Sequence, residues 1–427
     1  MSTSVPTAAA TRDGIASPTS PAHRSPGRGD GVAVLVAAGL LVWWAIQAFG
    51  DPLTLDVGLA YQGGQVALAT GHPERLGTWI STPFLAVVMA GVSKTVTVGT
   101  AANLVTVANL GVVVALLAGV WRGLLGALPP WAWRLSLVAM AGFGPMVSSV
   151  WWNQLNLLAL GLAVAGFALV GRERDVLGAV AISLSLAVKP LVVLLPLALL
   201  VKRDTRRAGL LVLLITVGVM LVSQGVLAIW AGDAGALDPL PALRNFSHKA
   251  LPANIWACQY ENFSPSSTLC RLSGGDNWNY IRGVSLAGVG LLALLFADLL
   301  RHAAGRAWEW FAVAVALSPM VSPIAWSHYQ VLLAPLLVVL FVRFLGERER
   351  LSTWGFLLAA YALTMLVWQP YGTLPGKLGE LLAGNDRTQQ QLIAAAGVAQ
   401  FAQYVLLFAA ALHFTRRPPG APRPQAA

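Results

Sequence analysis

The sequence predicts an all-α integral membrane protein, and three observations lead to this fold class. Hydrophobic residues make up 56% of the 427 positions, charged residues make up 11%, and the mean hydropathy is +0.67. Soluble domains carry about 25% charged residues. Apolar runs long enough to cross a bilayer also recur along most of the chain. The net charge of +10 sits in short clusters between these runs and forms no basic face, so no nucleic-acid partner is expected.

The two ends of the chain differ from its body. Residues 1–30 and 414–427 are poor in apolar side chains and rich in small residues and proline, which predicts two disordered tails. Residues 31–413 are expected to form one transmembrane domain. Its first apolar run is followed by Gly50-Asp51-Pro52 and no small-residue cleavage site, so we interpret it as a retained anchor.

About twelve spanning helices are expected in this domain, since a span needs about 20 apolar residues, or 17 in a thin membrane. The candidates are 31–49, 100–121, 132–148, 154–171, 175–188, 190–201, 208–231, 281–300, 308–326, 329–345, 352–370 and 391–413. The two shortest, 175–188 and 190–201, are expected to form a hairpin whose Lys189-Pro190 tip stays below the outer membrane surface. A lysine at such a depth is a candidate functional residue, although it could also reach the surface along its own stem.

The positions of the Lys and Arg residues predict how the chain is oriented in the membrane. The run at 83–93 is too short to span and is expected to be an interfacial or re-entrant helix, which with 57–70 forms a surface ledge. With this assignment 19 of the 28 Lys and Arg residues fall on one side, which the positive-inside rule makes the cytoplasmic side. Both termini are then cytoplasmic, and the main outer loops are 50–99 and 232–280.

Two cysteines, Cys258 and Cys270, lie in the second outer loop. A pair twelve residues apart in an oxidising compartment favours a disulfide. A metal site would need more ligands nearby, and none has the required spacing. No metal or cofactor is therefore expected.

Most polar residues of chemical interest fall on the outer side: Asp56, Asn153, Gln154, Asn156, Lys189, Asn262, Ser264, Arg271 and His328. No phosphate-binding Gly-rich loop, HExxH motif or Ser nucleophile elbow accompanies them. A carboxylate beside cations, amides and a histidine suits one-base chemistry on a phosphate-bearing substrate. Structural alternatives remain open: Asp56 could cap a helix, the three amides could link helices, and Trp326 could be an interfacial belt residue.

These residues resemble the polyprenyl-phosphate-sugar-dependent glycosyltransferases of GT-C type, family 87, which include actinobacterial α-mannosyltransferases acting on phosphatidylinositol mannosides. The resemblance covers roughly residues 31–370. It is carried by Asp56, Tyr61 and Gly71, the turn Ser81-Thr82-Pro83-Phe84, the stretch Asn153-Gln154-Leu155-Asn156, Lys189, Asn262 and Ser264 with Arg271 following, and the motif Ser322-Pro323-Ile324-Ala325-Trp326-Ser327-His328. A second histidine of the family pattern is Tyr329 here.

The resemblance implies a GT-C-like catalytic domain in a bacterial cytoplasmic membrane, with its active site on the outer face. A sugar, mannose by this resemblance, would pass with inversion from a polyprenyl phosphate to a glycolipid or cell-envelope glycan. Asp56 would be the general base, and His328 would contact the donor phosphate or sugar. Lys189, Arg271, Asn262, Ser264, the three amides, Tyr61 and Trp326 would bind the donor. Two alternatives are a polyprenyl-phosphate-arabinofuranose-dependent enzyme and a lipid or sugar transporter or flippase.

Overall fold

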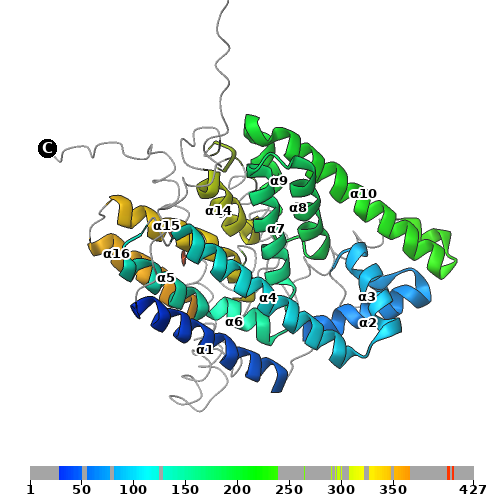
Figure 1. Ribbon diagram of the computed structural model, residues 1–427. Helices are drawn as coiled ribbons and strands as arrows, with labels where there is room; N and C mark the ends of the chain where they lie inside the picture. Colours follow the sequence, from blue (N-terminus) through cyan, green and yellow to red (C-terminus); the bar gives the residue numbers. More distant parts are fainter. Residues whose placement is uncertain are drawn as a thin grey trace, which may run out of the picture.

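The structure is a computed structural model, and the regular elements of its described residues are all helical. It describes residues 28–50, 55–76, 81–124, 128–238, 264, 290, 294, 296–298, 300, 307–321, 327–347, 351–365, 402–403 and 406–407. The elements are α1 (Arg28–Gly50), α2 (Leu55–Thr70), η1 (Pro73–Arg75), α3 (Pro83–Thr95), α4 (Val98–Leu124), α5 (Pro130–Ala141), α6 (Gly144–Trp151), α7 (Asn156–Gly171), α8 (Asp175–Val188), α9 (Leu194–Val201), η2 (Arg203–Thr205), α10 (Arg206–Ala231), η3 (Ala234–Leu237), α14 (Ala307–Leu317), η4 (Ser318–Val321), η5 (Ser327–Leu333), α15 (Ala334–Glu347) and α16 (Leu351–Met365) (Figure 1).

Four helical segments are long and apolar enough to cross a membrane. They are Gly29–Phe49, Val98–Arg122, Arg203–Ala231 and His328–Leu345, and a fifth span is possible if the bent pair Pro130–Trp151 and Asn156–Gly171 counts as one. Large apolar side chains on these helices face outward: Leu35 is 72% exposed and Ile229 is 79% exposed. Exposed apolar faces of this size fit contact with lipid. The all-helical class is therefore confirmed for the described residues, and the four apolar helices fit a membrane protein, whereas the number of twelve spans stays a prediction.

Four predicted helices are wrong in their extent, and prolines and a glycine explain three of these differences. The expected helix 132–148 is interrupted at Gly142, and a separate helix, α6, begins at Gly144 with Pro145 in its first turn. The expected helix 190–201 begins only at Leu194, after Pro190. The α-helical part of 308–326 ends at Leu317, since Pro319 lacks the N–H of the next turn. The expected helix 329–345 starts as the 3₁₀ segment η5 and becomes α-helical at Ala334.

Helices α2 and α3 form a hairpin that packs beside the second half of α10 (Figure 1). The α2–α3 contact is close because a Cβ on Gly64 would lie 2.4 Å from the Met89 backbone. The expected turn at 81–84 caps α3: Thr82 Oγ1 accepts from Leu85 N at 3.2 Å, and Pro83 begins the helix. The same hydroxyl donates to Ala187 O, so the start of α3 is tied to the end of α8.

Helix α10 continues far beyond its neighbour α8. Ser183 Oγ of α8 donates to Val212 O of α10 at 3.0 Å, which fixes their register. After this contact α8 continues for five residues, to Val188, and α10 for 19 residues, to Ala231. At 1.5 Å per residue, the end of α10 extends about 20 Å further than the end of α8.

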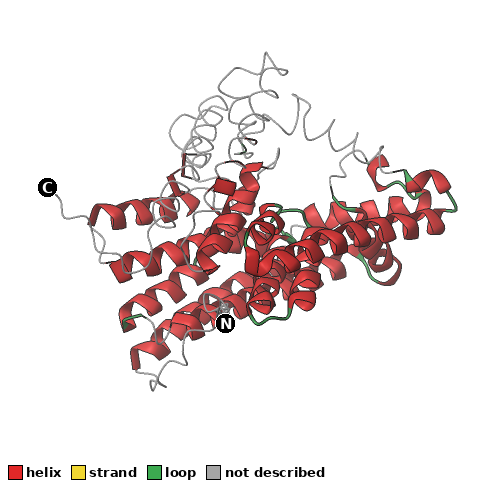
Figure 2. Ribbon diagram, turned by 90° about the horizontal axis from the view of Figure 1, so that it is seen from above, coloured by secondary structure: helices red, strands yellow, loops and turns green. Residues whose placement is uncertain are grey.

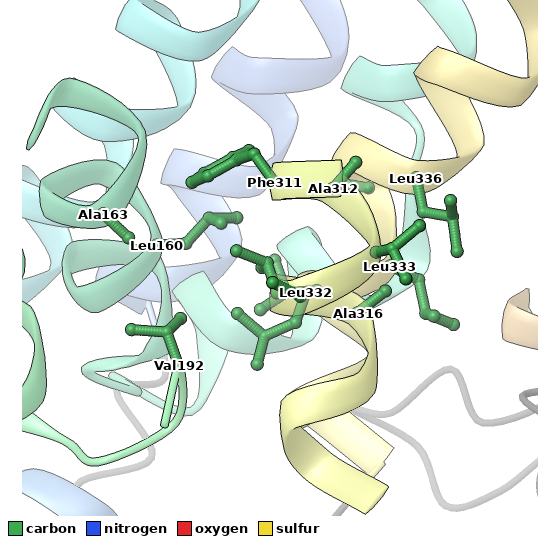
Figure 3. Close-up of a cluster of buried hydrophobic side chains, with 14 of the residues drawn as sticks. Leu160, Ala163, Val192, Phe311, Ala312, Ala316, Leu332, Leu333 and Leu336 are labelled. Atoms are coloured by element: carbon green, nitrogen blue, oxygen red, sulfur yellow. The ribbon is translucent and has the colours of Figure 1, made fainter. Parts of the chain in front are cut away.

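The core lies where α7, α14, η5 and α15 meet, and Figure 3 shows Leu160, Phe311, Leu332 and Leu333 within it. Every residue of α14 except Trp308 is buried, which makes α14 the central helix of the described part. Seen from above, many of the helices run in roughly the same direction (Figure 2). Their interior is therefore an apolar helix-to-helix core, and the polar residues within it stand out.

Candidate active site

The centre of the candidate site is an ion pair between Asp56 and Lys189. Asp56 lies in the first turn of α2, and Lys189 directly follows α8. The Lys189 Nζ donates to Asp56 Oδ2 at 3.1 Å. Lys189 adopts an extended backbone, because a residue before proline is disfavoured in the helical region. The end of α8 and the start of α2 thus bring together two residues that are 133 positions apart.

Gln154 is the third member of this centre. Lys189 Nζ also donates to Gln154 Oε1 at 3.0 Å, so one ammonium bridges a carboxylate and an amide. Gln154 lies in the turn between α6 and α7 and is 1% exposed. The turn requires Asn153 to adopt a φ of 52°, in the left-handed region that asparagine tolerates better than most residues.

Two aromatic rings of η5 border the ammonium. Lys189 Nζ lies 4.9 Å from the centroid of the Tyr329 ring, within the range of a cation–π contact. The His328 ring meets the Tyr329 ring edge-on at 4.9 Å. Asn156 Nδ2 donates to His328 O at 3.3 Å and so ties η5 to the start of α7. The predicted residues Asp56, Gln154, Asn156, Lys189 and His328 are therefore neighbours in the structure.

Some polar atoms beside this centre are buried without a hydrogen-bond partner among the described residues. They include His328 Nε2 and Asn156 Oδ1. Leaving a buried polar atom unpaired is unfavourable by about 1–3 kcal/mol. Asn156 Oδ1 can therefore accept a hydrogen bond from a ligand, and His328 Nε2 can accept or donate one, without losing a bond inside the protein.

The electrostatics of the centre keep Asp56 ionised. Burial by itself raises the pKa of Asp56, but the Lys189 ammonium, His328 and hydrogen bonds from Lys189 and Gln154 outweigh it. The net effect holds the pKa of this carboxyl below its ordinary value of 3.8. Its side chain is 30% exposed, compared with 17% for Lys189, so Asp56 is the more accessible member of the pair. An ionised, accessible carboxylate is able to accept a proton from an incoming hydroxyl.

Two other predicted donor-binding residues contact protein groups away from Lys189. The Tyr61 hydroxyl donates to Val96 O at 2.9 Å and ties α2 to the end of α3. Asn153 Oδ1 accepts from Thr106 of α4. Ser264 is buried, and the residues on either side of it are not described. Arg271, Asn262, Trp326, Cys258 and Cys270 lie outside the described residues, so their predicted roles and the disulfide stay predictions.

Two of the other carboxylates on the predicted outer face are engaged elsewhere. Glu74 Oε1 lies 2.8 Å from His72 Nδ1, and Asp233 Oδ2 lies 3.4 Å from His72 Nε2. This cluster joins the end of α2 to the segment after α10. Glu74 and Asp233 thus serve a different contact from the one that Asp56 makes with Lys189.

Sequence reasoning missed the residues of α4 that support the site. Thr106 and Asn109 are both 0% exposed, and Asn109 Nδ2 donates to Gln154 O at 2.8 Å. The sequence did contain a signal for Thr106 and Asn109, since they are polar residues three positions apart in a predicted membrane span. Polar side chains inside membrane helices often mark a functional region.

Comparison with known proteins identifies the family. The model of glycosyltransferase family 87 matches residues 79–323, which is more than half of the chain. The match includes Gln154 and Lys189, while Asp56 precedes it and His328 follows it. No curated protein and no solved structure matches the chain. The match over most of the membrane domain establishes that the chain belongs to glycosyltransferase family 87.

Proposed function

We propose that this protein is an inverting, GT-C-type membrane glycosyltransferase that uses a polyprenyl-phosphate-linked sugar, with mannose as the sugar transferred. The acceptor is a glycolipid or cell-envelope glycan on the outer face of a bacterial cytoplasmic membrane. The observation that carries the proposal is the Asp56–Lys189 ion pair beside His328, in a chain of glycosyltransferase family 87. A carboxylate next to a cation is the pair of charges that such a transfer needs.

In this reaction, each residue of the candidate site has one role. The acceptor oxygen attacks the anomeric carbon of the sugar while its proton passes to the Asp56 carboxylate. The bond between that carbon and the phosphate oxygen breaks, and its electron pair leaves with the polyprenyl phosphate. Lys189 stabilises the charge that grows on the phosphate. His328 Nε2 and Asn156 Oδ1, which have no partner among the described residues, are available to the sugar hydroxyls or the phosphate.

The ion pair also suggests why binding and proton transfer follow one another. A base that is paired with an ammonium binds a proton weakly. The phosphate of an arriving donor competes with Asp56 for Lys189, because both are anions that accept from the same Nζ. Once Lys189 turns toward the phosphate, the proton affinity of Asp56 rises. Asp56 thereby becomes the stronger base only when a donor is bound.

The test uses purified protein in lipid nanodiscs with polyprenyl-phosphate-mannose and a phosphatidylinositol mannoside as acceptor. Asp56→Asn should lower product formation by about 10²–10⁴-fold, the range that a general base contributes. Glu74→Gln is the matched control, since it neutralises an outer-face carboxylate that contacts His72, and should leave the rate near wild type. Unchanged melting temperatures would show that both variants fold. Full activity of Asp56→Asn would remove Asp56 as the base.

The sugar and the acceptor are tested separately. A parallel reaction with a polyprenyl-phosphate-arabinofuranose donor should give no product if mannose is the transferred sugar. A comparison of membrane lipids and cell-wall glycans between a deletion strain and its parent should show one mannosylated species missing. Loss of an arabinofuranosylated species would instead reassign the donor.

A further inference from the structure

Helix α4 contributes two fully buried polar side chains to the back of the candidate site. Thr106 and Asn109 are each 0% exposed and lie on a helix that is otherwise apolar enough to span a membrane. Thr106 Oγ1 donates to Asn153 Oδ1. Asn109 Nδ2 donates to Gln154 O at 2.8 Å and also approaches Ser149 O at 3.4 Å. Both residues therefore hold the single turn that carries Gln154.

That turn needs support because its backbone is unusual. It joins two helical segments that are bent by 119° relative to each other, and Asn153 within it has a positive φ of 52°. A residue other than glycine in this region persists where the surrounding contacts fix it. Here the contacts come from the turn itself, through Gln154 N to Ser149 O at 2.8 Å, and from Asn109.

The path from α4 to the reacting groups is continuous. Asn109 holds the main chain of Gln154, Gln154 Oε1 accepts from Lys189 Nζ, and Lys189 pairs with Asp56. A shift of this main chain by a fraction of an ångström would move the amide oxygen away from the ammonium. Positioning errors of this size reduce catalysis even when they arise outside the reacting groups.

We propose that Asn109, supported by Thr106, is a positioning residue that fixes the α6–α7 turn so that Gln154 holds Lys189 against Asp56. This inference rests on the proposed function of Asp56 and Lys189. The simpler reading is that Asn109 only links α4 to α6 and α7, as polar side chains do between membrane helices. The way Asn109 uses its amide favours positioning: Nδ2 makes both contacts to this turn, while Oδ1 has no partner in the described part of the chain.

A double-mutant cycle separates the two readings. We expect Asn109→Leu to lower kcat/KM for polyprenyl-phosphate-mannose about tenfold, equivalent to about 1.4 kcal/mol. In a Gln154→Leu background the same change should alter kcat/KM less than about twofold, because its route to Lys189 is already lost. The acid limb of the pH profile should also move in the same direction in Asn109→Leu and in Gln154→Leu.

The matched control is Ser183→Ala. It removes an equally buried hydrogen bond between helices, from Ser183 to Val212 O, which does not lead to Gln154. It should lower the melting temperature while leaving kcat/KM and the pH profile near wild type in both backgrounds. If Asn109→Leu behaves in this way, or if its effects add to those of Gln154→Leu, the positioning role is wrong.

Two further measurements keep the result interpretable. If Asn109→Leu does not fold, Thr106→Val removes the other contact to the turn with almost no change in volume and is judged by the same criterion. Asp56→Asn is measured alongside. An active Asp56→Asn overturns the proposed function itself, whereas an inactive Asp56→Asn with a neutral Asn109→Leu overturns this inference alone.

Discussion

The Lys189 Nζ lies 3.1 Å from Asp56 Oδ2, and at this distance each residue affects the charge state of the other. The pKa of Asp56 lies below its ordinary value, so the pair stabilises the fold at pH values above that ordinary value. The contribution is lost as the pH falls through the lowered pKa of the folded state. Both the stability and the activity of the protein should therefore decline in acid.

A charge-removing variant tests this coupling. In Lys189→Met, burial still raises the pKa of Asp56 and the opposing ammonium is gone, so the pKa should rise. The acid limb of kcat/KM should then move to higher pH, and the rate should fall because the phosphate loses its cation. Lys94→Met, which removes a lysine over the Trp230 ring of α10, serves as the control. An acid limb identical to wild type in Lys189→Met would contradict the coupling.

His328 offers a second test, in which stability and activity should move in opposite directions. Its Nε2 is buried without a partner in the described ranges, so His328→Phe removes an unsatisfied group and keeps a ring of similar shape. The melting temperature should stay equal or rise, since an unpaired buried polar atom is unfavourable by about 1–3 kcal/mol. If Nε2 contacts the sugar donor, activity should fall about 10–100-fold. This is at or slightly below the loss found when one charge-stabilising hydrogen-bond donor is removed from an active site. Unchanged turnover would remove His328 from the site.

At the scale of elements, α7 and α8 form a closely packed helix pair beside the site. A Cβ on Gly166 would lie 2.6 Å from Ile182 Cγ1 and 2.8 Å from Gly178 O, and a Cβ on Gly178 would lie 2.7 Å from Gly166 O. Small residues that let two backbones approach in this way stabilise helix pairs in membranes. The pair fixes the distance between Asn156 at the start of α7 and Lys189 after α8.

Replacing one of these glycines with a larger residue should push α7 and α8 apart. Gly166→Ala is expected to destabilise the protein by about 1–3 kcal/mol, as overpacking of a filled core does. Gly225→Ala on α10 is the control, because its Cβ would meet nothing within 4 Å and alanine favours a helix. Thermal unfolding of both variants in detergent measures the difference. Equal melting temperatures would show that the α7–α8 contact is looser than described.

Which elements could be predicted depends on what the local sequence signals. The long apolar runs at 31–49, 100–121 and 208–231 correspond to α1, α4 and α10, because hydropathy alone defines such helices. The break at Gly142 was missed although Gly142 and Pro145 mark it, since the apolar run continues through them. The 3₁₀ form of η5 has no comparable signal, because it arises from packing against α6, α7, α14 and α15.

For the candidate site, the sequence named several residues that lie together in the structure, but it could not predict their contacts. Asp56, Gln154, Lys189 and His328 were each named from a short motif, and they come from four separate parts of the chain. Their meeting depends on the α6–α7 turn and on the tie between Thr82 and Ala187 O, which are tertiary features. The Tyr61 hydroxyl contacts Val96 O, and its contact with the donor stays a prediction.

At the scale of the whole molecule, the orientation in the membrane is open to a direct experiment. In a variant without Cys258 and Cys270, a single cysteine is introduced either at Arg203 or at Asp238, both exposed and at opposite ends of α10. An impermeant thiol reagent should label the Asp238→Cys variant in intact cells, and the Arg203→Cys variant only after permeabilisation. The opposite pattern would place Asp56 on the cytoplasmic side.

The part of α10 that extends beyond the end of α8 has a consequence for how the proposed donor and acceptor could meet. Lys189 lies about 20 Å short of the end of α10, measured along that helix by its rise per residue. If the donor is a polyprenyl phosphate, as proposed, we expect its hydrocarbon to stay among the lipid tails while its phosphate approaches Lys189 from the side. In the same proposal, we expect the acceptor to approach Lys189 along α2, α3 and α10. A slender, lipid-anchored glycan is expected to fit this approach better than a bulky folded polymer.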